Sequence, residues 1–361
     1  MTSRAAATHP LPVLALLLLL AVCYAYFVAF GRDAENYTED VGVIQYTLNA
    51  HDHFVYVNNV DSIQQSGLEY QLNNDVGIAA LYVALSWLAP IPHDPSYIAT
   101  SFIFNCLTIT AIFFLYASIC RQLNLNQGAV ALFFANCYLI YFSQLINKDA
   151  LTILAFLLTV LMGLKGQLNR IWLLLPIFAL IRQQLLIFVL VYLVLSYSKR
   201  PVRSALILYV LTSLAAGLLS VFASVIGEES LGEGLSAQLI EFNANYYVGY
   251  LLFNPVRVLQ YAYDTLLSFD FVTDTGGLEA AKILRLPQLV VLIALTPTLL
   301  NLFRHFRQEM GVPRSREVLY AIVSYLLAWL MNPTVNARYV MLITPLLVLW
   351  ALHARQRDAN R

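Results

Sequence analysis

The strongest guide to the architecture is residues 171–197, which read IWLLLPIFALIRQQLLIFVLVYLVLSY. This run is apolar and longer than the roughly 20 residues that one helical crossing needs. Its middle holds Arg182, Gln183 and Gln184, with Pro176 before them. A charged side chain at mid-bilayer costs about 2.5 to 3.5 kcal/mol on insertion scales, so this arginine needs a special position.

Both flanks of the run are basic. Lys165 and Arg170 precede it, and the cluster at 199–203 follows it. Lysine and arginine in short loops favour the cytoplasm, so one straight crossing would place a basic flank on the wrong side. We therefore predict a hairpin of two half-length helices, or a water-filled cavity, that brings Arg182 towards the outer side. The alternative is an arginine that snorkels to the membrane surface, or a structural arginine that lies between helices.

The whole chain has the composition of a membrane protein. Of its 361 residues, 60% are hydrophobic and 12% are charged, whereas about a quarter of a soluble domain is charged. We predict an all-α, polytopic transmembrane helical bundle that forms a single integral membrane domain over residues 1–361. Several runs are too short for a full crossing. We therefore expect about nine to twelve membrane helices, some of them short or re-entrant. The apolar runs lie near residues 11–30, 76–91, 97–119, 129–146, 149–164, 171–197, 204–226, 246–263, 286–303, 318–332 and 338–353.

Charge and motifs argue against several function classes. The 21 basic and 21 acidic residues cancel, so no global field would recruit nucleic acid. The sequence has no Walker loop, no GxSxG, no HExxH and no dinucleotide-binding glycine pattern. Pairs such as His51 and His53 with Asp52 are more typical of surface loops than of a metal site. We expect no cofactor, no metal and no nucleic-acid partner.

The basic loops predict the orientation of the chain. Their clusters should face the cytoplasm, together with both termini. The polar region 31–75 should then pack as an outward juxtamembrane loop with helices, while the topology of 76–96 stays open. The basic clusters are Lys199, Arg200 and Arg203, then Arg304, Arg307, Arg314 and Arg316, and finally Arg355, Arg357 and Arg361.

The first outward loop begins with GRDAENYTED at residues 31–40. A carboxylate at the membrane edge is well placed to act as a general base, because partial desolvation raises its pKa towards neutrality. Asp33 is the first catalytic candidate, with Glu35 and Asp40 as alternates. Tyr37 shares a helical face with Asp33 and is a candidate to bind the same substrate. The alternative is a solvated acidic loop.

Three cations interrupt the apolar runs. Lys148 stands in Asn-Lys-Asp between two runs, Arg182 breaks a third, and Arg338 with Tyr339 opens the last one. Lysine supplies a point charge to phosphate, and arginine supplies a bidentate fork. We predict that Lys148, Arg182, Arg338 and Tyr339 bind substrate near the outer leaflet, which suits a polyanionic lipid. A plain loop at Lys148 and a structural arginine are the alternatives.

Short polar signals follow one another along the chain in a set order. The signals are Gly31-Arg32-Asp33 with Tyr37, Asn74-Asp75-Val76-Gly77-Ile78, Asp94-Pro95-Ser96, Tyr138 to Phe142 with Lys148, and the break at Arg182. They resemble bacterial exopolysaccharide and O-antigen polymerases of the EpsG or Wzy type, and the ending Ala337-Arg338-Tyr339 with Pro345 resembles GT-C-like membrane glycosyltransferases. The chain departs from that pattern at Lys148, where the family often has arginine, and near Arg182, where it often has histidine.

The resemblance implies a function. It implies joining of sugar or oligosaccharide units from a polyprenyl-diphosphate-linked glycan, on the outer face of the bacterial inner membrane, for polysaccharide biosynthesis. The implied partners are that glycan, the lipid bilayer and other polysaccharide-assembly membrane proteins. Two alternatives stay open: a GT-C monosaccharide transferase with a polyprenyl-phosphate sugar donor, and a non-catalytic transporter or assembly protein. Transporters commonly show paired broken helices, and this sequence has one obvious broken run.

Overall fold

The protein is all-α within the part of the chain that the structure describes. The computed structural model describes residues 10–32, 34, 48–67, 75–88, 91, 94, 96–126, 128–133, 136–226, 235–267, 279–332 and 337–359. Its first helices are α1 (Pro10–Tyr26), η1 (Phe27–Gly31), α3 (Ala50–Ser66), α4 (Val76–Leu88), α5 (Ile98–Gln122), α6 (Gly128–Phe133), α7 (Tyr138–Phe142) and α8 (Asp149–Leu164). The others are α9 (Leu168–Ile181), α10 (Gln183–Tyr197), α11 (Pro201–Ile226), α12 (Leu235–Tyr246), α13 (Gly249–Leu267), α14 (Ala280–Ile283), α15 (Leu286–Arg304), α16 (Phe306–Glu309), α17 (Ser315–Trp329) and α18 (Ala337–Ala359).

The helices have the lengths and composition of a membrane bundle. Among the described residues, five helical stretches are long and apolar enough to cross a bilayer: Pro10–Gly31, Ile98–Gln122, Pro201–Leu219, Ala280–Arg304 and Arg338–Ala359. Four shorter apolar helices accompany them: α4, α8, α9 and α10. Helices suit this setting because each satisfies its own backbone hydrogen bonds in lipid. The predicted polytopic bundle with short helices is confirmed.

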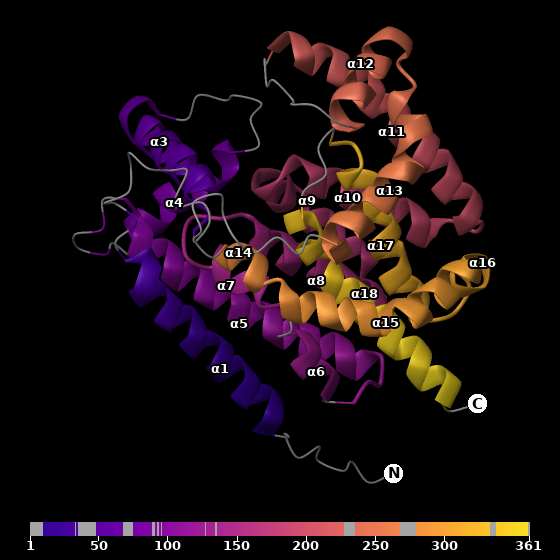
Figure 1. The fold of residues 1–361 in the computed structure, drawn as a ribbon, viewed down its shortest axis with the longest axis horizontal. Coiled ribbons are helices and arrows are strands. Elements are labelled where there is room, and N and C mark those ends of the chain that lie inside the picture. Colours follow the sequence, from indigo (N-terminus) through magenta and orange to yellow (C-terminus); the bar gives the residue numbers. More distant parts are fainter. Residues whose placement is uncertain are drawn as a thin grey trace.

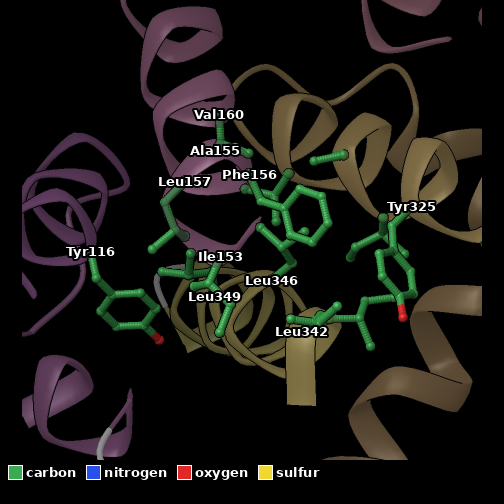
Figure 2. Close-up of a cluster of buried hydrophobic side chains, with 14 of the residues drawn as sticks. Tyr116, Ile153, Ala155, Phe156, Leu157, Val160, Tyr325, Leu342, Leu346 and Leu349 are labelled. Atoms are coloured by element: carbon green, nitrogen blue, oxygen red, sulfur yellow. The ribbon is translucent and has the colours of Figure 1, made fainter. Parts of the chain in front are cut away.

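The core lies where α5, α8, α17 and α18 meet (Figure 1). Phe156 of α8 packs against Phe188, Tyr325 and Trp329, with ring centroids 4.4 to 5.6 Å apart. Figure 2 shows Phe156 between the helix that carries Tyr325 and the leucines of α18. Burying an aromatic side chain of this size contributes several kcal/mol, so α8 is fixed firmly at the centre.

The run at 171–197 folds as the predicted hairpin. Arg182 has extended backbone angles (φ −163°, ψ 128°) and separates α9 from α10. The hydroxyl of Tyr197, at the end of α10, donates to Oδ1 of Asn169 at the start of α9, at 2.8 Å. The two helices therefore run antiparallel, and Arg182 lies at the tip of their hairpin.

The bundle has two chemically different ends. At the basic end, His353 and Gln356 of α18 reach the carbonyls that follow α5, and Arg357 pairs with Glu309 of α16. At the other end, called here the Asp149 end, α8 begins beside the hairpin tip and the start of α18. The helices α8, α10 and α18 run from the Asp149 end to the basic end.

Helix α4 stays at the Asp149 end. It follows Asp75, which pairs with Lys148, and its Tyr82 packs edge-on against Tyr97 at the start of α5. A methyl group added at Gly77 would overlap the backbone carbonyl of Leu180, so glycine is required for this close approach to α9. Gly77 and Tyr82 of α4 therefore both pack against residues near the Asp149 end.

The apolar run at 129–146 forms short helices, as the sequence predicts for runs too short to cross a bilayer. The described part of this segment forms the two short helices α6 and α7, and a non-helical loop follows. A helix rises about 1.5 Å per residue, so neither is long enough to cross a membrane. Polar Asn136, Ser143 and Gln144 break the run, and all three side chains are buried inside the protein.

Candidate functional site

The site begins with a buried loop at 143–148, between α7 and α8. Backbone groups in such a loop need partners, because water cannot reach them. Asn105 of α5 supplies two of these bonds, since its Nδ2 donates to the carbonyls of Ser143 (3.1 Å) and Leu145 (2.8 Å). The N–H of Ile146 donates to Nδ1 of His53, at 3.1 Å. Helices α3 and α5 therefore hold the loop in place.

Asp149 opens α8 at the end of this loop. Its backbone N–H donates to Oδ1 of Asn147 at 2.5 Å, and a carboxylate at a helix N-terminus is favoured by the helix dipole. The Asp149 side chain is buried between two guanidinium groups: Oδ1 lies 3.0 Å from Arg182 and Oδ2 lies 3.9 Å from Arg338. This carboxylate thus joins the hairpin tip to the start of α18.

Lys148 forms the second ion pair of the site. Its Nζ donates to Oδ1 of Asp75 at 2.8 Å, and it lies 5.5 Å from the ring centre of Tyr56 in α3. Tyr56 also interacts electrostatically with the charges of Arg182 and Asp149. The charges contributed by α3, α8 and the hairpin therefore form one cluster around this tyrosine.

Arg338 forms the third pair. Its Nη1 donates to Oδ2 of Asp52 at 2.5 Å, and its guanidinium lies 5.7 Å from the ring centre of Tyr339. Burial raises the pKa of Asp52, but the charge of Arg338 and hydrogen bonds from Arg338 and Asn49 outweigh it, so the pKa lies below its ordinary value. Asp52 is therefore ionised at neutral pH.

These six charged groups form what we call the ion cluster: Asp52, Asp75, Lys148, Asp149, Arg182 and Arg338. Arg182 and Asp149 lie at its floor, with side chains 4% and 1% exposed. Asp75 and Asp52 lie at its rim, with side chains 25% and 24% exposed. A bound anion could replace the rim carboxylates on Lys148 and Arg338 while the buried pair stays intact.

The structure brings together the four binding residues predicted from the sequence. Lys148, Arg182 and Arg338 belong to the ion cluster, and Tyr339 lies against it. Their role in binding stays a prediction. The catalytic candidates Asp33, Glu35 and Asp40, together with Tyr37, lie outside the described residues.

Sequence reasoning missed the acidic half of the cluster. Asp149 had a usable signal, because a carboxylate directly after Lys148 at the start of an apolar helix can pair inside the membrane. Asp75 also precedes an apolar helix. Asp52 carried no comparable signal, since it reaches Arg338 from a polar helix far away in sequence.

The histidine of α3 serves the fold. Burial lowers the pKa of His53 to about 4, so its ring is neutral at pH 7. Its Nδ1 accepts a hydrogen bond from Ile146, so the ring helps to hold the buried loop in place. Within the described ranges, no group of three His, Cys, Asp or Glu side chains could hold a metal ion.

No family model, no curated protein and no solved structure matches this chain. The support for a function therefore comes from the chemistry of the ion cluster.

Proposed function

We propose that this protein is a membrane glycosyltransferase that joins polyprenyl-diphosphate-linked sugar or oligosaccharide units during polysaccharide biosynthesis. The observation that supports it is the meeting of Lys148, Arg182 and Arg338 at the Asp149 end, away from the basic loops. A diphosphate leaving group needs cationic stabilisation, which two guanidiniums and one ammonium supply. The resemblance to EpsG- and Wzy-type polymerases favours the same chemistry.

The proposal includes an orientation. The basic end carries arginines and lysines from several loops and helix ends, and such residues favour the cytoplasm. The ion cluster would then face the outer side of a bacterial inner membrane. A lipid-linked sugar carried to that side would meet the cluster, where no nucleotide sugar is at hand.

The reaction would move one glycosyl group. The bond between the anomeric carbon and the diphosphate oxygen breaks, and the electron pair leaves with the diphosphate, held by Arg182 and Arg338. The acceptor hydroxyl forms the new bond and gives its proton to a carboxylate. Asp33, with Glu35 and Asp40 as alternates, is the base proposed from the sequence. Asp52 is a further one, because phosphate bound to Arg338 would release it from its ion pair.

Purified protein in lipid nanodiscs tests this function. We would supply a polyprenyl-diphosphate-linked oligosaccharide and follow longer glycans and released polyprenyl diphosphate by mass spectrometry. The proposal predicts both products, in equal amounts, from the wild-type protein. Lys148→Gln should reduce both, because it removes one cation of the ion cluster that receives the substrates.

A deletion strain separates the alternatives. Accumulation of single repeat units supports the polymerase. A polymer that lacks one sugar would identify a monosaccharide transferase instead. Unchanged polymer in strains with Lys148→Ala, Arg182→Ala or Arg338→Ala proteins, all inserted normally, would contradict catalysis and favour a transport or assembly role.

A further inference from the structure

Two apolar grooves flank the ion cluster on different helices. The first, called here the α15/α18 groove, lies between α13, α15, α17 and α18 and has a volume of about 220 Å³. The second, called here the α4/α9 groove, lies between α4, α5, α8 and α9 and has a volume of about 460 Å³. Carbon surfaces of this kind suit hydrocarbon chains.

The α15/α18 groove ends beneath the two arginines. Trp329 and Tyr339 form this end, with ring centres 5.8 Å from Arg182 and 5.7 Å from Arg338. The other end reaches Phe303 and Leu347, nearer the basic end. A chain that lies in this groove would thus deliver its phosphate to both guanidiniums.

The α4/α9 groove ends beside the ion pair of Lys148 and Asp75. Gly77 and Ile78, at this end, lie in the first turn of α4, just after Asp75, which is bound to Lys148. The groove then follows α8 and α9 as far as Leu158 and Leu174. A chain in this groove would place its head near one cation and one carboxylate, a combination that suits an acceptor hydroxyl better than a leaving diphosphate.

We infer that the two grooves hold two lipid chains at once, that of the sugar donor in the α15/α18 groove and that of a lipid-linked acceptor in the α4/α9 groove. This assignment rests on the proposed function. The charges support it, because the phosphate of a lipid in either groove would meet cations of the same cluster. Both substrates would therefore stay anchored in the membrane while their heads meet above Asp149.

Photolabelling tests the assignment without relying on sugar transfer. The probe is a polyprenyl diphosphate with a diazirine in its chain, added to wild-type protein in nanodiscs. We expect adducts on α15, α17 and α18 and on α8 and α9, located by mass spectrometry. Arg338→Gln should lower labelling of the α15/α18 groove about 10-fold or more, the effect of one lost charge-assisted bond. Lys148→Gln should do the same in the α4/α9 groove.

Filling each groove sharpens the test. Leu347→Trp narrows the α15/α18 groove and Leu158→Trp narrows the α4/α9 groove. The matched control is Leu173→Trp, because that side chain is 76% exposed and lines neither groove. Each filled groove should lose its own adducts and keep the other set, and in the transfer assay the first should raise KM for the donor and the second KM for the acceptor.

Other results would overturn the inference. Adducts in one groove alone, or equally on lipid-facing helix surfaces around Leu173, would contradict two lipid sites. The wild-type labelling pattern decides this even where a tryptophan variant does not fold. Two labelled grooves with no sugar transfer would instead contradict the proposed function, so the two failures are distinguishable.

Discussion

Helix α18 carries an arginine near each end, and the two behave differently. Arg357 binds Glu309 through both carboxylate oxygens, at 3.1 and 2.5 Å, and Ser315 donates to the same group. Arg338 binds Asp52 through one oxygen and is shared with Asp149. The first is a closed clamp between α18 and α16. Arg338 instead interacts with two carboxylates, and a phosphate could bind to the same guanidinium.

The surroundings explain the contrast. Arg357 stands among the basic clusters, and the proposed orientation, which puts them in the cytoplasm, would account for its charge. Arg338 stands at the opposite end, where that tendency disfavours it, beside Arg182 and two apolar grooves. The positive charge at the Asp149 end therefore needs another explanation. Binding of the proposed phosphate-bearing lipid would explain it.

The largest expected effect follows from removing the acid at the floor of the cluster. Asp149→Asn leaves the guanidinium of Arg182 buried without its counter-charge, and breaking a buried pair costs about 3 to 5 kcal/mol. We expect a much lower unfolding midpoint in detergent and little folded protein. The matched variant at the basic end is Arg316→Gln, which removes an exposed ion pair. Equal midpoints for the two variants would contradict a buried, structural role for Asp149.

A pH effect at His53 comes next. Its pKa is about 4 in the folded protein and about 6.5 in the unfolded chain. As pH falls from 6.5 to 4, the unfolded chain binds a proton that the folded protein does not, so stability falls by up to about 3 kcal/mol. Above pH 6.5 both states are neutral and the effect vanishes.

The variant His53→Asn isolates that effect. Asparagine can accept the hydrogen bond from Ile146 and does not titrate. The difference in unfolding midpoint between wild type and variant should therefore change below pH 6.5 and stay constant above it. A difference that is independent of pH from 4 to 8 would show that His53 does not titrate as described.

The sequence alone predicts the scaffold better than the chemistry. The hairpin follows from two local facts, an apolar run too long for one helix and an arginine at its middle. The cations of the cluster follow from the same logic, since each interrupts an apolar run. Their acids do not, because Asp52 and Asp75 reach Arg338 and Lys148 through tertiary packing of α3 and α4, which no local pattern encodes.

The buried loop shows the same limit. The loop at 143–148 lies at the end of an apolar run, and Asn105, placed far earlier in the chain, provides the hydrogen bonds that let it stay irregular. Only the packing of α5 against α8 brings these residues together. Long-range satisfaction of backbone groups of this kind is not visible in hydropathy.

A medium effect is expected from Asn105 itself. Asn105→Ala leaves the carbonyls of Ser143 and Leu145 without these donors inside the protein, which costs about 1 to 3 kcal/mol. Thr108→Ala is the matched control one turn later, because its hydroxyl bonds only the Phe104 carbonyl of its own helix. Asn105→Ala should lower the unfolding midpoint and the transfer rate together. An Asn105 variant as stable and active as the control would show that these two hydrogen bonds do not hold the loop in place.

The smallest effect is expected at the basic end. Arg316 pairs with Glu317 at 3.0 Å, but its side chain is 48% exposed. Exposed ion pairs contribute about 0 to 1 kcal/mol, so Arg316→Gln should leave the unfolding midpoint nearly unchanged. A loss as large as that of Asp149→Asn would show that the two ends do not differ as described.

The comparison of the two arginines of α18 tests most directly whether the Asp149 end binds the diphosphate. Arg338→Gln and Arg357→Gln proteins would be assayed for transfer from a polyprenyl-diphosphate-linked oligosaccharide in nanodiscs, at matched folded amounts. Removing a group that stabilises developing charge costs about 100- to 1,000-fold in rate, so we predict that loss for Arg338→Gln and a change within about twofold for Arg357→Gln. Equal rates for the two variants would contradict a phosphate-binding ion cluster.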